Sequence, residues 1–199
     1  MNKAVNIKVV SLDLFGTLVD VRRGLEPAWN TILGDANSDS LKRKYWDRAT
    51  EILRDKLLVA GDGNGWFKNI RSVFEDAFRD FFNETHLDFN PQTAAELWIL
   101  GHRSSYYYPD ASVFMSEIFR KHLVCLSSDT SMEMVPGIIE TQRFDSIFIS
   151  EDMRCYKTSS VYWNYIVQHY GFHAASILHI GDASADVIGA KECGIVTCW

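Results

Sequence analysis

The second half of the chain alternates short apolar runs with stretches whose apolar residues recur at helical spacing. The apolar runs have the length of strands, and each stretch between them is long enough for a connecting helix. The pattern predicts strands at 122–127, 146–150 and 176–180, with helices at 131–141 and 159–170. A similar apolar run near the N-terminus ends at Leu12. Strands separated by helices are typical of βαβ units, so we expect an α/β fold with a doubly wound parallel sheet.

The region from about residue 21 to residue 105 has a different pattern. Apolar side chains recur there at helical spacing in separate stripes, and these stripes predict helices around Trp29, after Leu41, after Ile70 and from Pro91 onward. We expect the many aromatic side chains to form the core of a helical unit inserted between the first and second strands. The glycine-rich segment 61–65 is expected to be a loop between helices; the alternative is a phosphate-cradling loop, although no strand precedes it.

The composition is that of an ordinary globular protein. Of the 199 residues, 47% are hydrophobic and 23% are charged, which allows one main domain with a modest insertion. The formal net charge of −6 argues against nucleic acid and anionic membrane as partners. No apolar run approaches the roughly 18 residues that span a bilayer. Four cysteines without a CxxC pair are expected to be buried free thiols, as is typical of a cytoplasmic protein.

Polar side chains follow the predicted strands at the edge where parallel strands end. Asp13 follows the first strand, Ser128 ends the second, and Lys157 comes 29 positions after Ser128. Asp182 lies 25 positions after Lys157, and it follows the last predicted strand together with Asp186. Doubly wound sheets bind ligands outside the carboxyl ends of their strands. We therefore expect a hydroxyl, an ammonium group and three carboxylates to meet in one crevice.

This order of residues resembles the four sequence motifs of the haloacid dehalogenase (HAD) hydrolase superfamily, over nearly the whole chain. The resemblance implies a Rossmann-like HAD core made of residues 1–20 and 106–199. It also implies a C1-type helical cap at residues 21–105. In the superfamily such a cap closes over the site and selects the substrate.

Carried over to this sequence, the resemblance assigns a role to each strand-end residue. Asp13 corresponds to the nucleophile and a metal ligand, and Ser128 to the hydroxyl that holds a phosphoryl oxygen. Lys157 corresponds to the cation that steadies both the aspartate and the transferred group. Asp182 corresponds to a direct Mg²⁺ ligand, with Asp186 supporting the ion directly or through water. Oxygen ligands of this kind are those that Mg²⁺ prefers.

The turn after the nucleophile departs from the commonest form of the motif. Gly16 and Thr17 are expected to let backbone amides approach a substrate anion, with Asp129 and Phe15 also bordering the substrate. Most phosphatases of the superfamily carry a second aspartate at the position of Phe15, which protonates the leaving group and then activates water. Such acid–base help is typically worth about 10²–10⁴-fold in rate. The backbone carbonyl of Phe15 still corresponds to a metal ligand, so the resemblance implies metal binding with slow turnover.

Phe15 leaves three interpretations open. We favour a Mg²⁺-dependent phosphatase that acts on a small phosphorylated metabolite through an aspartyl-phosphate at Asp13. The second interpretation is a metal-free 2-haloacid dehalogenase, because such enzymes carry an aromatic residue at this position; Arg22 and Arg23 are candidate anchors for the substrate carboxylate. Asp182 argues against that interpretation, since a metal-free enzyme has no need of it. The third is a weakly active or inactive HAD-fold protein that binds a phosphorylated ligand or a protein partner.

Overall fold

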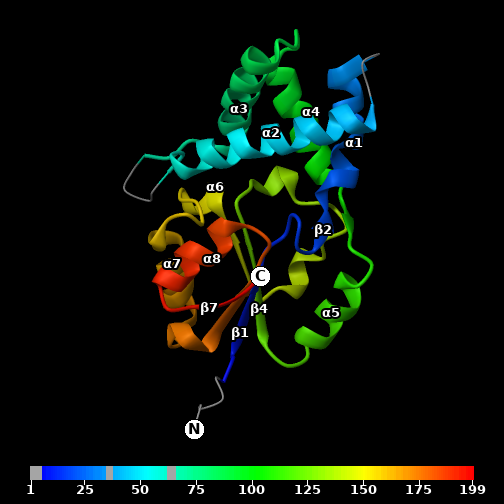
Figure 1. Ribbon diagram of the computed structural model, residues 1–199. Coiled ribbons are helices and arrows are strands. Elements are labelled where there is room, and N and C mark those ends of the chain that lie inside the picture. Colours follow the sequence, from blue (N-terminus) through cyan, green and yellow to red (C-terminus); the bar gives the residue numbers. More distant parts are fainter. Residues whose placement is uncertain (1–5, 35–37, 62–65) are drawn as a thin grey trace.

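The centre of the protein is a parallel five-stranded sheet in a computed structural model that describes residues 6–34, 38–61 and 66–199 (Figure 1). The strands are β1 (Val9–Leu12), β4 (Leu123–Ser128), β5 (Ser146–Ile149), β6 (Ile177–Ile180) and β7 (Val196–Cys198). Their order is β5-β4-β1-β6-β7, so β1 lies in the middle and each neighbouring pair is parallel. The predicted α/β fold with a parallel sheet is confirmed.

Helices cover both faces of the sheet because successive residues of a strand point to opposite sides. Val10 and Leu12 pack in the cluster that contains residues of α5 (Ala111–Ile118). Val9 packs in the cluster that contains residues of α7 (Ser160–Tyr170) and α8 (Ser184–Glu192). Figure 1 shows α5 on one side of the strands and α7 with α8 on the other. Every residue of β1 is buried, as expected for the central strand of a parallel sheet.

A helical insertion lies beyond the end of the sheet toward which β1 runs (Figure 1). Its described helices are α1 (Val21–Leu33), α2 (Asp39–Leu58), α3 (Ile70–Thr85) and α4 (Pro91–Arg103). The short strands β2 (Val19–Asp20) and β3 (Tyr106–Tyr107) pair antiparallel at the two ends of the insertion. Because these two ends meet, the insertion is held at one edge of the sheet.

The helices of the insertion begin where the sequence supplies capping side chains. Each accepts a hydrogen bond from the backbone three residues on, which satisfies one of the free amides of the first turn. The caps are Asp20, Ser38, Asn69 and Asn90. The buried faces of the helices then share one core, in which Trp29 and Trp98 pack edge to face with ring centroids 5.5 Å apart. Phe81 packs against Trp29 in the same core at 5.9 Å.

Several elements differ from the sequence-based expectation. The helix predicted at 131–141 is wrong: the chain there forms two single 3₁₀ turns, Met132–Met134 and Thr141–Arg143. Pro136 explains the break, because proline lacks a backbone N–H and pushes Val135 into an extended conformation. Helix α5 and edge strand β7 were not predicted, since α5 has apolar residues on most of its surface and β7 is only three residues long.

Some expectations are tested only in part. The segment Asp62–Gly65 of the glycine-rich loop lies outside the described residues, while Gly61 bridges to Phe67. All four cysteines lie within the described residues and are free; Cys125 and Cys155 are buried as expected, but Cys198 is exposed. No helix in the described part of the chain is both long and apolar enough to cross a bilayer.

Truncation of Phe81 tests the core of the insertion. Its side chain has no exposed surface and packs against the Trp29 and Tyr45 rings. We expect Phe81→Ala to lower the free energy of unfolding by about 3–5 kcal/mol, because it leaves a cavity in a close-packed core. The matched control is Phe114→Ala on α5, whose side chain is 39% exposed. Urea unfolding that shows equal losses for the two variants would contradict this packing.

Candidate active site

Asp13 stands at the end of the central strand, between two apolar anchors. Leu12 and Leu14 on either side of it are fully buried. The Asp13 amide donates a hydrogen bond of 2.9 Å to the Ile180 carbonyl at the end of β6. These contacts fix the backbone and leave the carboxylate at the carboxyl edge of the sheet, where it is only 6% exposed.

The turn after Asp13 holds the carboxylate and contacts Asp182. Thr17 Oγ1 donates to Asp13 Oδ2 over 3.1 Å. Gly16 has a φ of +84°, a conformation that L side chains rarely adopt, and a Cβ there would lie 2.2 Å from Asp182 Oδ2. Glycine is therefore required both for the turn and for the close approach of Asp182. The turn brings motif residues from two distant segments together.

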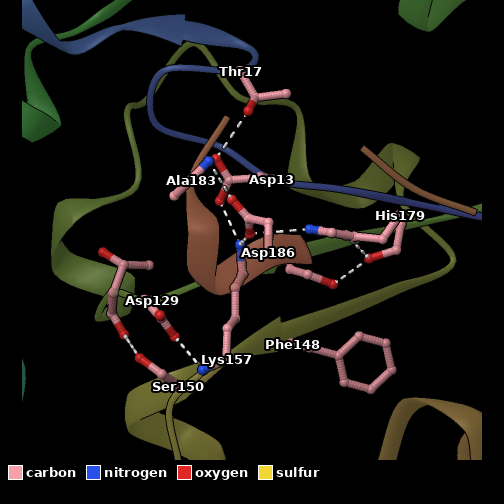
Figure 2. A network of polar contacts seen from close by, with 12 residues as sticks. Asp13, Thr17, Asp129, Phe148, Ser150, Lys157, His179, Ala183 and Asp186 are labelled. Carbon is pink, nitrogen blue, oxygen red and sulfur yellow. Dashed lines mark hydrogen bonds and ion pairs between the residues drawn. The ribbon is translucent and has the colours of Figure 1, made fainter. Parts of the chain in front are cut away.

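Lys157 places a buried ammonium group between two carboxylates (Figure 2). Its Nζ lies 2.5 Å from Asp13 Oδ1 and 2.7 Å from Asp186 Oδ1. Burial alone would lower the pKa of Lys157, but the two carboxylates outweigh it and hold that pKa well above its usual value. The lysine is therefore charged, and it neutralises only part of the negative charge around it.

The backbone of Lys157 is fixed by side chains at both of its polar groups. Its amide donates to Asp129 Oδ1 over 2.9 Å, and its carbonyl accepts the indole N–H of Trp163 over 2.7 Å. A Cβ on Gly189 would lie 2.3 Å from the same carbonyl, so α8 also packs closely here. Burial raises the pKa of Asp129 to about 6, against the opposing effect of Lys157. The Asp129 carboxylate thus binds the backbone of Lys157.

Three carboxylates converge at this edge. Ligand oxygens of Asp13, Asp182 and Asp186 lie within 4.8 Å of one another. Burial raises the pKa of Asp13 to about 7; Lys157 opposes this shift and the neighbouring carboxylates add to it. Burial would also raise the pKa of Asp186, but Lys157 and His179 hold it well below the usual range. The set is rich in hard oxygen donors and carries more negative than positive charge, which suits a divalent cation such as Mg²⁺.

The remaining predicted residues border this cluster. Ser128 is the last residue of β4 and 1% exposed, and its hydroxyl makes no hydrogen bond to any side chain or backbone group of residues 6–34, 38–61 and 66–199. The Phe15 ring packs edge to face against His102 of α4, with centroids 4.6 Å apart. Phe15 therefore joins the turn after Asp13 to the helical insertion.

Sequence reasoning missed two histidines, of which one contacts the cluster and the other contacts Phe15. His179 Nε2 lies 3.0 Å from Asp186 Oδ1, and His102 contacts Phe15. His179 could have been noticed as a polar residue inside an otherwise apolar strand. His102 carried no such signal, because a histidine at the end of a helix is as common on the protein surface as in the interior.

Comparison with known proteins agrees with this geometry. The sequence model of haloacid dehalogenase-like hydrolases matches residues 7–194. The chain belongs to this family of hydrolases. The family match agrees with the parallel sheet order and with the polar residues at the strand ends.

Relatives of this HAD hydrolase include both phosphatases and dehalogenases. Phosphoglycolate phosphatases of Vibrio parahaemolyticus and Vibrio cholerae are 22% and 20% identical, each over 95% of this chain and 81% and 82% of their own lengths. The L-2-haloacid dehalogenase of Xanthobacter autotrophicus superposes with a TM-score of 0.75 at 19% identity, over 96% of this chain and 76% of its own. The HAD hydrolase YfnB of Bacillus subtilis, solved bound to magnesium, superposes with a TM-score of 0.78 at 18% identity. The superposition covers 98% of this chain and 88% of YfnB.

The charge of Asp13 is expected to destabilise the metal-free protein at alkaline pH. The folded pKa of about 7 lies above the unfolded value of about 3.9, so folding holds the proton more tightly and stability is lost as the pH rises between these values. Asp13→Asn keeps an acceptor for Lys157 but removes the charge. We expect it to raise Tm at pH 8 in chelator and to have little effect on Tm at pH 4. For a chain of this size, a change of 1 kcal/mol in the free energy of unfolding shifts Tm by about 2–4 °C.

The control for this experiment is Asp88→Asn, which changes an exposed carboxylate in the insertion. It should leave Tm nearly unchanged at both pH values. A lower Tm for Asp13→Asn than for the wild type at pH 8 would show that the buried charge stabilises the fold.

Proposed function

We propose that this HAD hydrolase is a Mg²⁺-dependent phosphatase that acts on a small phosphorylated metabolite through an aspartyl-phosphate at Asp13. The observation that carries the proposal is the position of Asp182. Its carboxylate lies within 4.8 Å of those of Asp13 and Asp186 and packs against the turn at Gly16. A site without a cation gains nothing from a third carboxylate placed there.

Charge explains why a cation belongs in this site. Three carboxylates and the single ammonium of Lys157 would repel a phosphate dianion. Mg²⁺ would be held by Asp13 and Asp182, with the Phe15 carbonyl and Asp186 as further ligands, and when bound it would neutralise charge on the phosphoryl oxygens. The magnesium bound to YfnB, which has the same fold, supports this choice of ion.

The residues of the chain would carry the reaction in two displacements. In the first, a carboxylate oxygen of Asp13 forms a bond to phosphorus as the bond from phosphorus to the ester oxygen breaks, and the leaving oxygen takes a proton from solvent. In the second, a water oxygen bonds to phosphorus and loses a proton to solvent, the acyl-phosphate bond breaks and Asp13 is regenerated. Lys157 offsets the negative charge around the transferred group, and the Ser128 hydroxyl is free to donate to a phosphoryl oxygen. Thr17 holds Asp13 in place.

A 2-haloacid dehalogenase is the second candidate function. Phe15 favours it, because an aromatic residue at this position is expected in that class. The candidate anchors for a substrate carboxylate are already engaged: Arg22 lies over the Trp46 ring at 5.4 Å and Arg23 over the Tyr106 ring at 5.3 Å. These contacts, together with Asp182, make the phosphatase the stronger proposal.

A substrate panel separates these functions. We expect phosphate release from generic phosphate esters with Mg²⁺, loss of activity with chelator, and no halide release from 2-haloacids. Asp182→Asn should reduce phosphatase activity by at least about 10-fold, because it removes one anionic ligand of the cation. Asp88→Asn serves as the control. Chelator-resistant halide release would contradict the proposal, and inactivity on both panels with Mg²⁺ still bound would favour a binding protein.

The absence of an acid at position 15 predicts a strong dependence on the leaving group. Phe15 cannot donate a proton, so p-nitrophenyl phosphate, whose leaving group departs as an anion, should react much faster than alkyl phosphates. Phe15→Asp should raise kcat for alkyl phosphates by about 10²-fold or more, the lower end of typical acid–base effects. Phe15→Asn is the matched control, because asparagine has a size and polarity similar to those of aspartate but cannot act as an acid or a base. An equal response of the two variants would show that proton transfer does not limit the reaction.

A further inference from the structure

Three polar side chains lie side by side inside the sheet, next to the acidic cluster. Ser127 of β4, Ser11 of β1 and His179 of β6 each contribute one, and none of the three has any exposed surface. Ser11 and His179 are direct partners in the register of β1 with β6. Buried polar groups are costly unless they are hydrogen-bonded, so their contacts show what this arrangement does.

The three side chains form one hydrogen-bonded chain that ends on the active site. Ser127 Oγ lies 2.7 Å from Ser11 Oγ, and Ser11 Oγ lies 2.8 Å from His179 Nδ1. On the other side of the ring, His179 Nε2 lies 3.0 Å from Asp186 Oδ1. Figure 2 shows His179 to the right of Asp186, joined to it by a dashed line. The strands under the site are thus connected to one of its carboxylates.

The direction of the hydrogen bonds follows from the charge at the end of the chain. An ionised Asp186 only accepts, so Nε2 of His179 donates. With the ring proton on Nε2, Nδ1 of the imidazole accepts the hydroxyl proton of Ser11 over 2.8 Å. Ser11 then accepts from Ser127. Each proton in the chain therefore points toward Asp186.

Asp186 is consequently held at both oxygens. Oδ1 accepts from Lys157 and His179, and Oδ2 accepts the Ala183 amide over 3.0 Å. A Cβ on Gly181 would lie 2.5 Å from the Asp186 Cγ, so the backbone also closes on this side chain. With two donors on Oδ1, only Oδ2 keeps a lone pair for a further partner.

We propose that His179 is a positioning residue of this active site, which fixes the orientation of Asp186 and through it the placement of Lys157 and of the cation. This inference rests on the proposed function in one respect, namely that the cation is Mg²⁺. Trp163 packs edge to face on the imidazole at 4.6 Å and holds its plane. Ser11 and Ser127 hold the ring nitrogen that faces away from the site.

The test compares two substitutions of His179. His179→Leu removes the donor to Asp186 at similar volume, whereas His179→Gln places an amide N–H in about the position of Nε2. We expect His179→Leu to weaken Mg²⁺ binding and to lower kcat for p-nitrophenyl phosphate by about 10–100-fold each, with KM nearly unchanged. His179→Gln should recover most of both. Mg²⁺ binding is measured from the rise in Tm as the ion is added, without substrate.

His169→Leu is the matched control. His169 also bonds a serine, with Nε2 2.8 Å from Ser146 Oγ, but it lies on the surface and does not contact the acidic cluster. It should leave both readouts unchanged. A His179→Leu variant that has a lower Tm but the Mg²⁺ response and kcat of the wild type would overturn the inference, because His179 would then act only in the stability of the sheet.

A measurement without metal or substrate keeps the inference separate from the proposed function. Nitrogen-15 NMR of the metal-free wild type, with the His179 signals assigned from His179→Gln, should show a ring that carries a proton on Nε2. A ring protonated on Nδ1 alone would overturn the inference even if the protein is a phosphatase. If Mg²⁺ causes no rise in Tm of the wild type, the proposed function fails, and the NMR result alone decides the role of His179.

Discussion

The contact of the buried Lys157 ammonium group with Asp13 and Asp186 is the interaction on which the site depends. Removing an ion from water costs several kcal/mol, and a buried pair offsets that cost only when its geometry is maintained. The fold maintains it by fixing the lysine backbone: Asp129 binds the amide and Trp163 binds the carbonyl. The contacts of Asp129 and Trp163 therefore help to hold the Lys157 side chain in place.

The same arrangement leaves the site with an excess of negative charge. Lys157 cannot neutralise three carboxylates, and burial with neighbouring charge raises the pKa of Asp13 to about 7. A bound divalent cation would reduce the repulsion between the carboxylates and lower the pKa of Asp13, so that Asp13 would stay ionised. Phe15 adds no charge, and its ring instead packs on His102 of the helical insertion. The carboxylates thus suit the proposed phosphatase, whereas Phe15 is the aromatic residue expected of a dehalogenase.

The parallel sheet and the position of residues at its strand ends could be predicted from sequence, because the apolar runs and the spacing of Ser128, Lys157 and Asp182 reflect the βαβ repeat directly. The helix expected at 131–141 could not hold, since Pro136 removes a hydrogen-bond donor in its middle. The contacts of His102 with Phe15 and of His179 with Ser11 could not be predicted, because each joins segments that are distant in sequence. Pairing across strands depends on the register, which periodicity alone does not specify.

The central claim is that Asp13 attacks phosphorus and carries the transferred group. Borohydride reduction of the protein during turnover of p-nitrophenyl phosphate with Mg²⁺ tests it directly, because an acyl-phosphate is reduced to an alcohol while a free carboxylate is not. Peptide mass spectrometry should find homoserine at position 13 only when substrate and Mg²⁺ are both present. Phosphate release under these conditions with an unmodified Asp13, or with the reduction at another carboxylate, would contradict the account.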